Sequence, residues 1–261
     1  MKPTINFIFS IGYRGYSSDF LNIYKLRKIT SPFDYLYIDF ETSLKIINDN
    51  FNNFLHDIIL FNNKTKNIEL FYKKNTHEIN TKFYELLENN IGYMEYNYNA
   101  YNLLFNQNYL DDNILNNNLY NWNTICFFPY HNILDINIYN TIKNKCDRFI
   151  NIINKYNKTT ALFYITKIIN CDNILDYMNE ILNIKKKYYI KCFIIIIINC
   201  DNIEDSNYYN DIDKCLFIIK KVDDYITQAA RYETDNNLNY EKEFNIISNY
   251  FNFNLIDENN N

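Results

Sequence analysis

Short runs of consecutive apolar residues dominate the hydrophobic pattern of the C-terminal half of the chain. They lack the polar alternation of a half-exposed strand, and they lie at 124–128, 161–165, 192–198 and 216–219. A strand that is apolar on both faces fits a parallel sheet covered by helices on either side. Amphipathic segments with a period near 3.6 alternate with the runs, at 138–154, 173–185 and 240–251. This alternation predicts an α/β fold with an open, mainly parallel sheet and helices on both faces.

The N-terminal segment begins with the same pattern. An apolar run at 5–10 leads through a turn to a helix predicted at 18–28. A second helix is predicted from Thr42, as its N-cap, to Ile58, because its apolar residues recur with the helical period.

The middle of the chain is less regular. A strand is predicted at 68–72 and a helix near 78–89, whereas 90–121 mixes Tyr and Asn without a clear period. We therefore expect an irregular or helical insertion over about 62–121. It interrupts a single α/β domain at 1–255, which a disordered tail follows at 256–261.

The turn after the first strand is the first candidate site. Two of the three glycines in the chain, Gly12 and Gly15, lie in it. Glycine is favoured where φ is positive or where the backbone closely approaches another group, and strand-to-helix turns hold ligands and nucleophiles in α/β proteins. Tyr13 and Arg14 are candidate ligand-binding residues; the Arg14 guanidinium either binds a phosphate or carboxylate or is solvated. Gly12 and Ser17 are candidate ligand-binding residues of the same turn, and Ser17 and the serine that follows it are interpreted as helix caps rather than nucleophiles.

Other strand ends supply further candidates, because ligands bind at the carboxyl ends of parallel strands. His131 and Asn132 follow the run at 124–128, and His131 is either a general base or acid or a loop histidine bonded to a backbone carbonyl. Asp34 either holds its loop through an Asx turn or points into the same crevice. Asn199 and Asp201 follow the run at 192–198.

Composition narrows the class of protein. A net charge of −5 argues against a general nucleic-acid binder, which usually carries a basic face. The apolar runs are too short to span a bilayer and no signal peptide is evident, so we expect an intracellular, cytoplasmic protein without membrane binding. None of the six cysteines forms a C-x-x-C pair and no histidine has zinc-ligand spacing, which favours buried reduced thiols and indicates neither a metal nor a cofactor.

Four short segments together resemble a family of papain-like cysteine peptidases of unknown function from bacteria and large DNA viruses. They are Ser10–Ser17, Ser31–Tyr35, Phe128–Asn132 and the helix that contains Asp147, Arg148 and Phe149, and the resemblance covers about residues 5–225. In that family the turn usually reads Gly-Tyr-Arg-Cys and the Cys is the proposed nucleophile, whereas Gly15 holds this position here. The histidine of the family is matched by His131. The family label implies a papain-like fold, whereas the strand pattern predicts an open parallel sheet.

The resemblance therefore implies a hydrolase-like protein without its thiol, since glycine cannot act as a nucleophile. Three functions stay open. In the first, the chain is a degenerate member of the family, a pseudoenzyme that binds a protein or small-molecule ligand without cleaving it. In the second, it is an active hydrolase in which His131 is the base, and Arg14 and the turn amides hold an anionic or carbonyl oxygen of the substrate. Otherwise it is an interaction protein that contacts a partner through 91–120.

Overall fold

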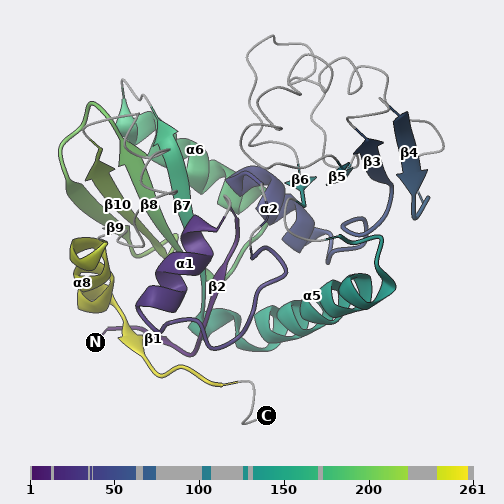
Figure 1. Cartoon of the computed structure of the whole chain (residues 1–261). Helices are drawn as coiled ribbons and strands as arrows, with labels where there is room; N and C mark the ends of the chain where they lie inside the picture. The colour runs from purple at the N-terminus through teal and green to yellow at the C-terminus, as the bar shows by residue number, and fades with distance from the viewer. Residues whose placement is uncertain are drawn as a thin grey trace.

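A five-stranded sheet forms the centre of the protein, in the order β2-β7-β8-β10-β9 (Figure 1). The structure is a computed structural model that describes residues 2–12, 15–34, 36, 38–62, 67–74, 102–106, 126–128, 132–169, 173–222 and 240–257. In sheet order, the strands are Phe7–Ser10, Thr160–Ile169, Phe193–Cys200, Cys215–Lys221 and Ser206–Asn210. The first four run parallel, and β9 pairs antiparallel with β10. The predicted α/β fold with an open, mainly parallel sheet is thereby confirmed.

The parallel strands are apolar because both of their faces are covered. Every residue of β8 is buried, and so is every residue of β2. β9 differs: its residues are exposed or half-buried, as expected of an edge strand. The apolar pattern therefore predicts β8 and misses β9, whose Ser, Asn and Tyr residues are held by pairing with β10.

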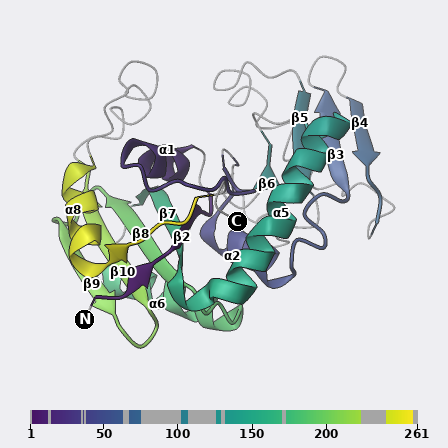
Figure 2. The ribbon, with the colours of Figure 1, turned by 90° about the horizontal axis from the view of Figure 1, so that it is seen from below.

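Helices cover both faces of this sheet, and Figure 2 shows α1 and α6 on opposite sides of it. The helices are α1 (Tyr16–Ile23), α2 (Phe40–Asn48), α5 (Ile136–Tyr156), α6 (Ile174–Lys187) and α8 (Glu241–Tyr250). Successive residues of a strand point to opposite faces. Phe163 stacks on Phe20 of α1 with ring centroids 4.6 Å apart, whereas Tyr164 contacts Phe40 of α2. The ring of Tyr24, the C-cap of α1, stacks on Phe244 of α8, which puts both helices on one face.

Helix ends differ from the predicted ones near the N-terminus. α2 ends at Asn48 and not at 58, because Asn50 and Phe51 adopt φ values of 55° and 61° that a helix cannot continue through. Its N-cap is Asp39, whose side chain accepts from the amide of Thr42, so Thr42 as N-cap was wrong. α1 likewise ends at Ile23 rather than at 28, before the left-handed Lys25.

A second sheet holds the described part of the insertion, in the order β4-β3-β5-β6. Its strands are Asn67–Phe71, Ile58–Asn62, Asn102–Asn106 and Cys126–Phe127, and all their pairings are antiparallel. The strand predicted at 68–72 is confirmed, but this region is a sheet where it is described, not irregular or helical. The helix predicted at 78–89 lies outside the described residues. β6 was wrongly predicted to join the parallel sheet, because its pairing partner is β5, a strand of the insertion.

The chain ends lie side by side. β1 (Thr4–Ile5) pairs in parallel with β11 (Asn252–Phe253), as Figure 1 shows below the main sheet. The amide of Ile256 donates to the carbonyl of Asn6, so backbone pairing continues into the segment predicted as a tail. Among the described helices, none is both long and apolar enough to cross a bilayer.

The cap of α2 makes stability depend on pH. Burial raises the pKa of Asp39 to about 6, although both Thr42 donors oppose the shift. A raised folded-state pKa means that the folded protein binds the proton more tightly than the unfolded chain, so stability falls as pH rises from about 4 to about 6.

Asp39→Asn keeps the cap acceptor and removes the charge. We expect the wild type to lose about 1–2 kcal/mol relative to this variant over that interval, measured by urea unfolding. A stability difference between the wild type and Asp39→Asn that does not change with pH contradicts the raised pKa of Asp39.

Candidate functional site

The turn after β2 requires one of its two glycines. Gly12 has a φ of +122°, and a Cβ added there would lie 2.4 Å from Ile38 Cγ2 and 3.0 Å from the Ile38 carbonyl oxygen. Both the conformation and the close approach therefore exclude a side chain. Gly15 has φ −75° and ψ −12°, ordinary helical values that any residue adopts. Glycine is thus a structural necessity at Gly12, whereas the backbone conformation of Gly15 does not demand it.

Buried hydroxyl groups hold this turn in place. The Ser17 hydroxyl donates to the Gly12 carbonyl over 2.8 Å and accepts from the Ile165 amide of β7 over 3.0 Å. Ser43 of α2 donates to the carbonyl of Ile11. Ser17 therefore joins the turn to the neighbouring strand and lies inside α1. The prediction that Ser17 and Ser18 cap the helix was wrong, since the N-cap is Gly15 and no side chain caps there.

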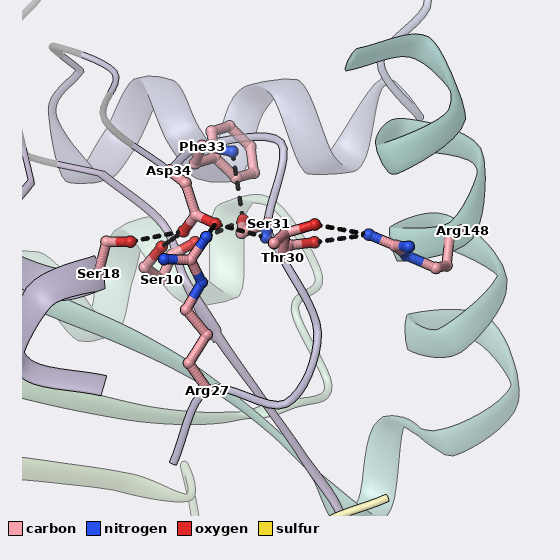
Figure 3. A network of polar contacts seen from close by, with 8 residues as sticks. All are labelled: Ser10, Ser18, Arg27, Thr30, Ser31, Phe33, Asp34 and Arg148. Carbon is pink, nitrogen blue, oxygen red and sulfur yellow. Dashed lines mark hydrogen bonds and ion pairs between the residues drawn. The ribbon is translucent and has the colours of Figure 1, made fainter. Parts of the chain in front are cut away.

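Asp34 is the centre of a buried polar network beside the turn (Figure 3). Its side chain is 3% exposed and forms an ion pair with Arg27 at 2.8 Å. One carboxylate oxygen accepts from the hydroxyls of Ser10 and Ser18, the latter at 3.0 Å, and the other accepts from the Ser31 amide at 2.9 Å. Asp34 thus holds its loop, as one of the two interpretations of the sequence had it. The bond runs to Ser31, three residues earlier, and is not an Asx turn.

A second arginine fixes the same loop from the opposite side. Arg148 of α5 donates through one guanidinium nitrogen to the carbonyl of Thr30 at 3.0 Å and to its hydroxyl at 2.9 Å (Figure 3). Burial lowers the pKa of Arg148 and also that of Lys145, one turn earlier. The Asp34 carboxylate opposes both shifts. The network is therefore a clamp between β2, α1 and α5, and its contacts position the glycine turn.

A β-bulge lies next to the turn on β7. The pairing of β7 with β8 shifts register between Ile165 and Ile168. Within this irregularity, the Thr166 hydroxyl accepts from the Asn199 amide at 3.0 Å, and the Thr166 carbonyl accepts from the Asn199 side chain at 2.7 Å. Bulges are frequent beside functional sites because they re-aim side chains. Since Ser17 bonds to Ile165, the ends of β2, β7 and β8 are joined by contiguous contacts.

Three residues missed by the sequence analysis complete this edge of the sheet. Tyr240, just before α8, is 4% exposed and its phenol lies beside the Asn199 side chain. Burial raises the pKa of Tyr240, so the phenol is neutral at physiological pH. Lys220 at the end of β10 lies 4.3 Å from the Tyr240 ring centroid and 3.0 Å from Glu243 Oε1. Of these four residues, only Asn199 was a candidate in the sequence analysis, because it follows a predicted strand.

Three buried acceptor oxygens of this cluster have no partner, whereas the other two such atoms in the described part of the chain, Asn6 Oδ1 and Asp49 Oδ1, lie outside it. Asn199 Oδ1 and Glu243 Oε2 have no hydrogen-bond partner in the part of the chain that the structure describes, and the same holds for Asp201 Oδ1. Asn199 is 1% exposed and Glu243 3% exposed. A buried acceptor left unpaired costs about 1–3 kcal/mol. Because all three atoms are acceptors, they suit a ligand that donates hydrogen bonds. The described residues contain no group of three or more His, Cys, Asp or Glu side chains that could hold a metal ion.

Cys200 ends β8 at this edge of the sheet, but it is fully buried and its thiol donates to Asn202 Oδ1 over 3.0 Å. Cys146, Cys192, Cys200 and Cys215 are free and buried, as predicted for reduced thiols. Burial raises the pKa of Cys192 to about 12 and that of Cys215 to about 11. Protonated thiols are poor nucleophiles.

The predicted site residues separate into three groups. Gly12, Ser17 and Asp34 are brought together, but as the buried support of the turn, with Gly15 at its outer end. Tyr13, Arg14 and His131 lie outside the described residues. Asn132 is exposed and follows β6. The argument that put His131 and Asn132 at the edge of the parallel sheet was wrong, because β6 belongs to the other sheet.

Comparison of the chain with protein-family models, curated proteins and solved structures found no match. The peptidase resemblance therefore stays a proposal.

The two glycines respond differently to substitution. We expect Gly12→Ala to lower the free energy of unfolding by about 2–4 kcal/mol, because its Cβ meets Ile38 in a disfavoured conformation. Gly15→Ala keeps its backbone conformation and is expected to change stability by less than about 1 kcal/mol. Urea unfolding of both variants tests the difference, and equal effects contradict it.

The Asp34 clamp responds as a buried ion pair. Asp34→Asn leaves Arg27 without its charge partner, and we expect a loss of about 3 kcal/mol in the free energy of unfolding. Glu41→Gln is the control, because its pair with Lys187 is exposed and contributes at most about 0.5 kcal/mol. Both values come from chemical denaturation, and similar losses in the two variants refute the role of Asp34.

Proposed function

We propose that this chain is a thiol-inactive, peptidase-like binding protein that holds a hydrogen-bond-donating ligand at the carboxyl edge of β2, β7 and β8. The observation that carries the proposal is the pair of buried acceptors, Asn199 Oδ1 and Glu243 Oε2, without protein partners among the described residues. They lie near the edge where open α/β sheets bind ligands. The bulge at Thr166 and the glycine turn adjoin the same strand ends.

The loss of thiol chemistry follows from the position of Gly15. The resembling family has its proposed nucleophile there, and Gly15 is the N-cap of α1. A helix N-terminus lowers the pKa of a thiol, so the backbone retains the setting for a reactive cysteine while the side chain is absent. The other described cysteines are buried and cannot replace it.

The acceptors define the ligand class. Amine, amide N–H and hydroxyl groups donate hydrogen bonds to carboxylate and amide oxygens. A peptide is the ligand that the family resemblance implies. Adjacent strands lie about 4.8 Å apart, so the ends of β2 and β8 are separated by about 10 Å, the length of about three extended residues. A short peptide segment would span this edge from the glycine turn to Asn199.

Restoring the thiol tests the position of the missing nucleophile. We expect Gly15→Cys to react with iodoacetamide at pH 7 about tenfold faster than Ile23→Cys, an exposed position at the other end of α1. Peptide mapping by mass spectrometry identifies the labelled residue and separates it from the native cysteines. Equal reactivity of the two variants contradicts a thiol-activating setting at Gly15.

Ligand binding is tested with a peptide selected from a display library on the wild-type protein. We expect Glu243→Gln to weaken binding about tenfold in calorimetry. The substitution removes the charge and replaces one of the two carboxylate oxygens by an NH2 group, which cannot accept a hydrogen bond. Glu241→Gln in the same first turn of α8 is the control. Mass spectrometry of the peptide after incubation should show no cleavage. Cleavage that His131→Ala abolishes would establish the active-hydrolase alternative instead, and unchanged binding by Glu243→Gln would remove the proposed edge.

A further inference from the structure

The amino-terminal edge of the same sheet carries a basic hollow of about 550 Å³. It lies among the start of β7, the end of α6 and the loops before β8 and β10. Its charged lining consists of Lys158, Lys185, Lys186, Lys191, Lys214 and Asp213, so five lysines face one aspartate and the lining carries a formal charge of +4. The chain as a whole has a charge of −5. The hollow is therefore a local concentration of positive charge on an acidic protein.

Two prominent apolar side chains border this hollow. Ile212 is 92% exposed and Tyr189 is 83% exposed, more than the other large hydrophobic residues exposed on the described part of the chain. Both line the basic hollow. Tyr189 is held in a left-handed conformation, with φ 53°, by backbone bonds that end α6. An isoleucine and a tyrosine exposed together beside lysines suit a partner that contacts both apolar and positive groups.

The lysines are held in place by the fold. Lys185 is 5% exposed and donates to the carbonyl of Asp213, while Lys186 pairs with the Asp213 carboxylate at 3.3 Å. The Asp213 carboxylate is thereby paired, whereas Lys158 and Lys191 are exposed. Asp211, exposed beside Ile212, adds one negative charge in the same hairpin and leaves the edge positive.

We propose that this edge docks on an anionic lipid surface, with Ile212 and Tyr189 at the level of the head groups and the lysines on lipid phosphates. A free phosphate ligand requires the lysines alone, whereas a lipid surface uses both features. Tyrosine is favoured at membrane interfaces, and basic clusters bind the anionic leaflet electrostatically. The docking is peripheral, and it leaves the carboxyl edge of the sheet on the opposite side free for its ligand.

Co-sedimentation with vesicles tests the proposal. The full chain is mixed with phosphatidylcholine vesicles and with vesicles that contain about 30% phosphatidylserine, and we expect binding to the second alone. Lys158→Gln combined with Lys191→Gln should weaken vesicle binding about 25-fold, because each lysine contributes about fivefold. High salt should also weaken the binding of the wild type, because it screens the attraction. The pair Tyr189→Ser and Ile212→Ser should weaken it about tenfold or more.

Leu175→Ser is the matched control, because Leu175 is 63% exposed at the start of α6, away from the hollow. It should bind anionic vesicles like the wild type. Circular dichroism verifies that each variant is folded. Equal binding to neutral vesicles, loss of binding in Leu175→Ser, or binding unchanged by the Tyr189 and Ile212 substitutions overturns the lipid assignment. So does binding of labelled single-stranded DNA or tripolyphosphate through the same lysines without vesicle binding.

Discussion

The buried carboxylate of Asp34 is the interaction on which the organisation of the N-terminal region depends. A charge with 3% exposure is tolerated only when it is paired and hydrogen-bonded. Its partners come from a strand, a helix and a loop: Ser10 ends β2, Ser18 belongs to α1, and Arg27 and Ser31 lie on the loop. One residue thereby determines how three segments meet, and the turn at Gly12 lies between them.

The same contacts extend to the functional edge of the sheet. Ser17 bonds to both Gly12 and Ile165, and Thr166 bonds to Asn199. Side-chain hydrogen bonds therefore join the ends of β2, β7 and β8. An unpaired buried acceptor costs stability. Asn199 Oδ1, Asp201 Oδ1 and Glu243 Oε2 are three of the six buried side-chain atoms without a partner in the described part of the chain, and they lie together at this edge.

The two edges of the sheet have opposite character. The carboxyl edge offers acceptor oxygens in a buried setting, and the amino edge offers lysines in an open hollow. Parallel strands give a sheet two distinct ends, since every carboxyl end lies on one side. The edge proposed to bind a ligand and the edge proposed to dock are then held apart by the length of the strands. We infer that the protein can bind a ligand while it is held at a surface.

The sequence pattern predicted the strands, helices and turn whose formation depends on residues close together in the chain. The apolar runs of β7, β8 and β10, the helical period of α5 and α6, and a turn after β2 that requires glycine were all readable along the chain, although not which of the two glycines is needed. Burial on both faces leaves no polar alternation, and a positive φ favours glycine wherever it occurs.

Tertiary structure alone decided the rest. The short run of β6 looks like a core strand, but pairing with β5 draws it into the second sheet, and its sequence contains no information on that partner. Ser17 and Ser18 have the composition of caps, yet their hydroxyls bond to groups on β7 and on Asp34. Tyr240 and Glu243 reach the strand ends from a distant helix. The sequence by itself determined which segments are strands and helices, because that depends on near neighbours. Which strands pair, and which polar groups meet, depended on contacts between segments far apart in the chain.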